Sequence, residues 1–96
     1  GTNFTDILFC CMDAKAIPYC LPVADELRLH GIKTEVYPEP AKLKKQLDYA
    51  NAKGIQWAAI IGENEMNKDE VSLKNLISGE QQSIHKNEIT GKIKNL

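Results

Sequence analysis

Three lysines near the start of a predicted helix form the first candidate site of this sequence. Lys42, Lys44 and Lys45 begin the segment 41–53, whose apolar residues recur at helical spacing, and Tyr49 lies one turn further on. Free backbone N–H groups and the helix dipole favour an anion at a helix N-terminus, so lysines placed there can hold a phosphate. The alternative is a solvated lysine face, which is common on surface helices.

Two carboxylates and an amide follow the next predicted strand. Glu63, Asn64 and Glu65 come directly after the apolar run 57–61 and Gly62. Such groups can bond to the exposed edges of an unstacked nucleobase. A charged surface turn is the alternative reading. No His, Ser or Cys nucleophile is adjacent, so we expect recognition here and no catalytic residue.

The cysteines and histidines indicate neither a disulfide framework nor a metal site. Cys10, Cys11 and Cys20 are odd in number, two of them are adjacent in an apolar run, and their spacing fits no common zinc pattern. We expect buried, reduced thiols and no metal ligand. His30 and His85 are expected to be structural or solvated. The sequence also lacks the glycine-rich phosphate loops of common nucleotide-binding folds.

Length, composition and charge narrow the class of protein. The chain has 96 residues, of which 43% are apolar and 26% charged, as in a soluble protein with a single core. Its net charge of −1 excludes a polybasic module, so any RNA contact must be local. No segment resembles a membrane span or a signal peptide, which predicts a cytoplasmic protein without membrane contact. The start at Gly1 and the amphipathic end predict that residues 1–96 are one domain cut from the C-terminal part of a longer chain.

The order of the expected elements predicts an α/β fold. Residues 5–11, 33–37 and 57–61 read as strands, and helices at 13–31 and 41–53 separate them. Strand–helix–strand crossovers of this length imply parallel pairing, with 5–11 in the middle. The segments 71–77 and 82–86 read as a hairpin that extends the sheet, followed by a helix that Asn87 caps. The result is a three-layer fold in which a five-stranded mixed sheet, its first three strands parallel, is flanked by three helices.

Within the first helix we expect Asp13 as the N-cap and Gly31 as the terminator. Its buried stripe is expected at Ile17, Leu21, Ala24 and Leu27. Pro22 predicts that this helix begins late or bends. Ligands of open α/β sheets bind beyond the carboxyl ends of the strands, so the lysines and the glutamates are expected to line one cleft.

Two motifs, together with the order of elements, carry a resemblance to a known family. K-L-K-K-Q-L-x-Y-A at 42–50, followed by Gly54, and I-I-G-E-x-E at 60–65 resemble the C-terminal anticodon-binding domain of histidyl-tRNA synthetases, over essentially the whole chain. The G-x-x-E ending is shared with other class IIa synthetases, whereas K-K-Q-x-x-Y-A points to histidine. Many bacterial relatives read G-R-S-L-K-K-Q where this chain has residues 40–46. Lys42 replaces that arginine only in part, because lysine lacks the bidentate fork.

The resemblance implies that the domain binds the anticodon loop of a histidine tRNA. A separate class II catalytic domain of the same chain would attach histidine to its tRNA with ATP and Mg, in a cytoplasmic homodimer. This fragment is expected to be non-catalytic and to need no cofactor. The residues implied to contact the anticodon loop are Tyr37, Glu39, Lys42, Lys44, Lys45, Gln46, Glu63 and Glu65.

Two other hypotheses stay open. The same domain can serve another class IIa synthetase, or a regulatory protein or kinase that senses uncharged tRNA or dimerises. A flavodoxin-like domain that binds a small molecule, or a stand-alone enzyme, is disfavoured by the missing phosphate loop.

Overall fold

The central sheet is built around the most apolar strand of the chain, β1 (Ile7–Cys11), which is buried along its whole length. The computed structural model describes residues 5–94. In it, β1 pairs in parallel with β2 (Thr34–Val36) and with β3 (Trp57–Ile61). β4 (Glu70–Asn75) runs antiparallel to β3, and β5 (Gln81–His85) antiparallel to β4. The strand order β2-β1-β3-β4-β5 confirms the predicted fold class, with β1 inside the parallel part.

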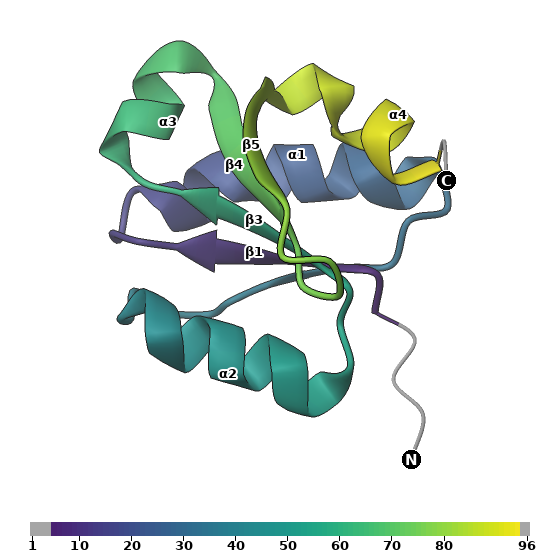
Figure 1. Cartoon of the computed structure of the whole chain (residues 1–96). Helices are drawn as coiled ribbons and strands as arrows, with labels where there is room; N and C mark the ends of the chain where they lie inside the picture. The colour runs from purple at the N-terminus through teal and green to yellow at the C-terminus, as the bar shows by residue number, and fades with distance from the viewer. Residues whose placement is uncertain (1–4, 95–96) are drawn as a thin grey trace.

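Helices cover both faces of this sheet (Figure 1). Alternate strand residues point to opposite faces, and they build two separate cores. Ile7, Phe9 and Cys11 pack against α1 (Ala16–Leu29), together with residues of the short helices α3 (Glu63–Lys68) and α4 (Ile89–Lys94). Leu8 and Cys10 pack on the other side, beneath α2 (Leu43–Lys53). The sheet therefore separates α2 from the other helices.

Helix α1 differs from its prediction at the start and on one position of its face. It begins at Ala16, after a turn in which the Asp13 carboxylate accepts a hydrogen bond from the Lys15 N–H at 2.9 Å. Its buried stripe runs through Cys20 in place of Leu21, which is 48% exposed. The stripe continues from Ala16 in steps of four and then three residues, and that spacing selects Cys20. Pro22 lies inside the helix. The helix ends before Gly31, and Gly31 adopts the predicted left-handed backbone conformation, with φ 80°.

The short helix α3 was not predicted. Residues 63–65, read as a surface turn, form its first turn. The Glu65 carboxylate accepts a hydrogen bond from the Gly62 N–H at 2.7 Å, which satisfies a backbone donor that the helix leaves free. Two acidic residues in the first turn also complement the helix dipole. Asp69 then ends the helix in the left-handed conformation, φ 54°.

The C-terminal elements also differ from their prediction. β4 ends at Asn75, because its side-chain oxygen accepts hydrogen bonds from Ile77 and Ser78 and begins the hairpin turn there. Asn87 does not cap a helix. It lies inside a 3₁₀ turn, η1 (Lys86–Glu88), which His85 caps by accepting from the Asn87 N–H at 3.1 Å. The predicted end of the last helix, at residues 95–96, lies outside the described residues. None of the described helices is long and apolar enough to cross a membrane.

Candidate functional site

The carboxyl ends of the parallel strands β2, β1 and β3 meet at one edge of the sheet, here called the carboxyl edge. The loops 12–15 and 37–42 and the residue Gly62 leave the strands at this edge. Figure 1 shows α3 and the start of α2 at this end of the sheet, on opposite faces. Both predicted segments therefore lie at the carboxyl edge: the lysine cluster (Lys42, Lys44 and Lys45) and the acidic turn (Glu63, Asn64 and Glu65).

The lysine cluster is exposed at the start of α2. Lys44 forms an ion pair with Asp48 at 2.8 Å, and Lys45 one with Glu39 at 3.5 Å. The hydrogen bond and the charge of Asp48 raise the pKa of Lys44. Lys42 has no carboxylate within ion-pair distance among residues 5–94. The cluster thus offers one unpaired and two loosely paired ammonium groups, since exposed ion pairs are weak.

Gln46, predicted to contact RNA, is fully buried. Its amide nitrogen donates to the carbonyl oxygen of Cys11 at 2.9 Å and to that of Ala41 at 2.8 Å. These bonds join α2 to the end of β1 and to the loop that precedes α2. Its oxygen Oε1 has no hydrogen-bond partner among the described residues. Gln46 therefore positions the lysine cluster and does not present its side chain to solvent.

Tyr37 is also inside the domain, while Glu39 is exposed. Only 9% of Tyr37 is accessible, its N–H donates to the Phe9 carbonyl at 3.0 Å, and its ring packs edge-to-face on Tyr49, with centroids 5.7 Å apart. The Tyr49 hydroxyl donates in turn to the Glu35 carboxylate, which raises the pKa of Tyr49. Tyr37 therefore belongs to the packing beneath α2.

The acidic turn is held by its own helix cap. One oxygen of Glu65 accepts from the Gly62 N–H, whereas Glu63 and Asn64 are exposed. A Cβ atom built on Gly62 would lie 3.2 Å from that Glu65 oxygen and 3.5 Å from the Cβ of Met12. The absence of a side chain at Gly62 lets Glu65 close over the strand end.

Met12, which the sequence analysis did not select, lies between the two segments. Its sulfur is 4.0 Å from the amide nitrogen of Gln46, and its Cβ and Cγ face Gly62. The residue is 38% exposed. Lys15, also exposed, follows in the same loop. The partly exposed Met12 thus lies between the start of α2 and the start of α3. The sequence marks this residue only as an apolar residue directly after a predicted strand.

A polar cluster on the α1 face of the sheet has a structural role. The Tyr19 hydroxyl donates to the Asp69 carboxylate at 2.5 Å, and the Lys86 ammonium lies 3.2 Å from the same oxygen and 5.0 Å from the Tyr19 ring centre. Both contacts lower the pKa of Asp69; the hydrogen bond from Tyr19 has the larger effect and the contact with Lys86 the smaller one. The cluster joins α1 to the beginning of β4 and the end of β5.

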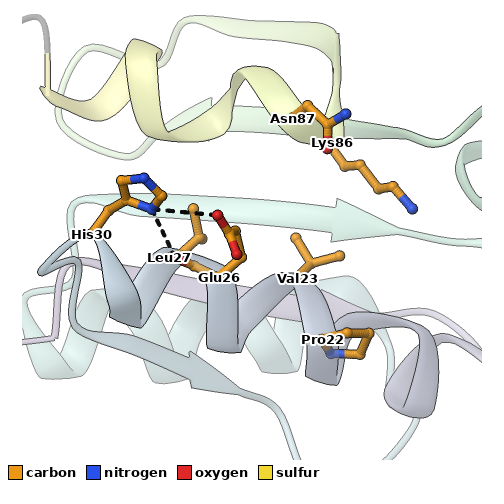
Figure 2. A pocket seen from close by; sticks show the side chains of 7 residues that line it. All are labelled: Pro22, Val23, Glu26, Leu27, His30, Lys86 and Asn87. Carbon is orange, nitrogen blue, oxygen red and sulfur yellow. Dashed lines mark hydrogen bonds and ion pairs between the residues drawn. The ribbon is translucent and has the colours of Figure 1, made fainter.

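A groove of about 510 Å³ lies between α1 and η1 (Figure 2). Pro22, Val23 and Leu27 give it an apolar side, and Lys86 and Asn87 lie opposite them. His30 and Lys86, two of its polar groups, already have partners. His30 Nδ1 lies 2.9 Å from the Glu26 carbonyl oxygen and 3.7 Å from the Glu26 carboxylate, and Lys86 pairs with Asp69. Among residues 5–94 no three histidine, cysteine or carboxylate side chains come together as a metal site.

Comparison with known proteins identifies the family. The family model described as anticodon binding domain matches residues 6–96. The chain is 48% identical to the histidine–tRNA ligase of Cytophaga hutchinsonii over 92 residues, 96% of this chain and 20% of the ligase. It is 42% identical to that of Phocaeicola vulgatus over 94 residues, 98% of this chain and 21% of the ligase. The chain therefore spans about a fifth of the length of these relatives.

The fold agrees with solved structures of the same kind. The crystal structure of histidyl-tRNA synthetase from Nostoc sp. PCC 7120 superimposes with a TM-score of 0.92 at 30% identity, over 97% of this chain and 22% of that one. The match lies in a small part of each larger protein, and catalysis is not shown for this part. The chain belongs to the anticodon binding domain family and is homologous to the C-terminal part of histidine–tRNA ligases.

Proposed function

We propose that this domain binds the anticodon loop of a histidine tRNA at its carboxyl edge. The observation that carries the proposal is the position of Met12. Its sulfur lies 4.0 Å from the Gln46 amide nitrogen in α2, and its Cβ lies 3.5 Å from where a Cβ on Gly62, the residue before α3, would stand. In this proposal the lysine cluster binds phosphates and the acidic turn reads bases, with the partly exposed Met12 between the two segments. RNA recognition of single-stranded loops requires this combination of charge, hydrogen bonding and contact with unstacked bases.

The lysine cluster would hold the phosphates and set the register of the loop. Lys42 is available without the loss of an ion pair, and Lys44 and Lys45 can exchange their exposed carboxylate partners for phosphate at small cost. The same exchange would free the exposed carboxylate of Glu39, which pairs with Lys45, for a contact with the anticodon loop.

The acidic turn would read base edges. Glu63 and Asn64 are exposed, and Glu65 has a second carboxylate oxygen besides the one that accepts from Gly62. These oxygens can accept from exocyclic amines and ring N–H groups of unstacked bases. Gln46 and Tyr37 would act by positioning α2, because both are buried.

For the parent protein we propose a cytoplasmic histidine–tRNA ligase, in which a class II catalytic domain of the same chain attaches histidine with ATP and Mg. This proposal rests on the names of the relatives and on their greater length. A homodimer is proposed for the parent on the same resemblance. Within it, the present domain would supply recognition and no reacting group.

Binding of the anticodon stem-loop of a histidine tRNA tests the domain's role directly. Affinity for this stem-loop should exceed that for the same stem-loop with altered anticodon bases. Three lysine contacts predict a log–log salt slope of about −2, a loss of roughly 20-fold in affinity between 50 and 200 mM salt. Equal affinity for both stem-loops would contradict anticodon recognition, and an affinity without salt dependence would contradict the phosphate contacts.

A further inference from the structure

Two of the three cysteines contact each other in the core. The Sγ atoms of Cys11 and Cys20 are 3.9 Å apart, and both residues are fully buried. Cys11 is the last residue of β1, and Cys20 lies on the face of α1 that packs against that strand. The third cysteine, Cys10, points to the opposite face of the sheet, where its Sγ lies 4.0 Å from the Leu8 carbonyl oxygen.

We propose that Cys11 and Cys20 are a dithiol that a hydroperoxide converts into a disulfide, while Cys10 stays reduced. The observation behind the proposal is the sulfur–sulfur contact. A disulfide needs about 2.05 Å between the sulfurs, so they must approach by roughly 2 Å. Small side-chain rotations and a slight shift of the first turns of α1 towards the end of β1 supply such a movement. The inference is independent of the proposed RNA binding.

The two thiols differ in acidity in a way that suits this chemistry. The hydrogen bond between the two thiols lowers the pKa of Cys11, and the same bond, together with burial, raises the pKa of Cys20. Burial raises the pKa of Cys10 to about 12, with a further contribution from the charge of Cys11. The thiolate is the reactive form, so Cys11 is the expected nucleophile.

The reaction balances with the peroxide alone. The Cys11 thiolate attacks one peroxide oxygen, the O–O bond breaks, and the leaving hydroxide takes a proton to become water. Cys11 is then a sulfenic acid. The sulfur of Cys20, giving up its proton, attacks the sulfur of Cys11, the S–O bond breaks, and a second water leaves. The two thiols lose two electrons in total, and the peroxide gains them.

Entry of the oxidant is easiest at the carboxyl edge. Met12, directly after Cys11, is 38% exposed, so the end of β1 lies close to solvent although the Cys11 sulfur itself is buried. Opening of the loop 12–15 would admit a small neutral molecule. Cys10 has no second thiol on its face of the sheet among the described residues.

Peptide mapping tests the proposal on the whole chain. The chain is treated with hydrogen peroxide, unfolded, alkylated and digested with trypsin. Cleavage after Lys15 and Arg28 separates residues 1–15, which carry Cys10 and Cys11, from residues 16–28, which carry Cys20. We expect the number of alkylated thiols to fall from three to one, a cross-link between these two peptides, and full recovery of the thiols with a reductant.

Variants assign the bond. Cys10→Ser should form the cross-link as the wild type does, and Cys11→Ser should keep both remaining thiols. Cys20→Ser, which lacks the second thiol, should form no cross-link and should stop at the sulfenic acid of Cys11. Fragmentation of the wild-type cross-linked peptide distinguishes Cys11 from Cys10 without any variant. Oxidation of the exposed Met12 shows that the peroxide has acted. Three intact thiols at that point, a sulfinic acid in place of the cross-link, or a cross-link through Cys10 would overturn the proposal.

Discussion

The side-chain amide of Gln46 donates a hydrogen bond to the carbonyl oxygen of Cys11 at 2.9 Å, and so joins α2 to the end of β1. The same nitrogen holds the carbonyl of Ala41 at 2.8 Å. A buried amide with two carbonyl acceptors fixes where α2 begins, and with it the lysine cluster. Sequence position 46 therefore controls the carboxyl edge without being accessible from it.

Gln46→Met should lower the free energy of unfolding by about 1–3 kcal/mol, because the buried Cys11 carbonyl and the partly buried Ala41 carbonyl lose their donor while the side-chain volume stays similar. The loss of the unpaired Oε1 offsets part of this cost. Urea denaturation measures the change, with Lys45→Met as the matched control on the exposed side of the same helix. A Gln46→Met variant as stable as the control would show that the amide does not hold α2.

Two substitutions at Glu65 separate its structural role from its proposed contact with a base. Glu65→Gln keeps an oxygen that can accept from Gly62, so its unfolding free energy should stay close to that of the wild type. Glu65→Ala should lose about 1 kcal/mol with the cap. Both should reduce the preference for the correct anticodon stem-loop. If the preference is unchanged in Glu65→Gln, the carboxylate does not read a base.

The sequence predicted the sheet better than it predicted the site. β1 and β3 are apolar on both faces, so their burial is visible in any short window of sequence. Helix α3 has six mostly polar residues, and the hydrogen bond between Glu65 and Gly62 that starts it leaves no periodic signal. Gln46 lies on the buried face of α2, three residues after Leu43 and four before Ala50. Because its side chain is polar, the sequence analysis assigned it to the RNA interface instead. The accessibility of Met12 depends on how the ends of β1 and β3 and the start of α2 come together at the carboxyl edge, which no local pattern records.

Met12→Ala should weaken binding of the histidine stem-loop roughly three- to tenfold, because the apolar surface between the two segments is lost. Met12→Leu keeps a similar apolar volume and should restore most of the affinity. Leu29→Ala is the control, since Leu29 is an apolar residue that is 81% exposed at the end of α1 and is not part of the carboxyl edge. Equal losses at positions 12 and 29, or none at position 12, would remove Met12 from the RNA interface.

Lys44→Glu should weaken binding of the matched and the altered stem-loop by the same factor and make the salt slope less negative by about 0.7, the contribution of one phosphate contact on a single strand. The preference between the two stem-loops should remain, because phosphate contacts carry no base information. Lys92→Glu, an exposed residue of α4 with the same change in charge, is the control. A loss of preference in Lys44→Glu would place the residue at a base instead.

Asp69 predicts how stability responds to acid. The pKa of Asp69 in the folded state is lowered, first by the hydrogen bond from Tyr19 and then by Lys86. The ionised carboxylate therefore stabilises the fold at pH values above the unfolded pKa of about 3.9, and this stabilisation is lost as the pH falls through the lower folded value. Asp69→Asn tolerates the left-handed backbone and still accepts from Tyr19, but it has no charge to titrate. Between neutral pH and about pH 3 the variant should lose less stability than the wild type, as measured by urea midpoints. Tyr19→Phe removes the larger cause and should lie between the two. If wild type and Asp69→Asn lose the same amount, the Tyr19 and Lys86 contacts do not favour the ionised carboxylate in solution.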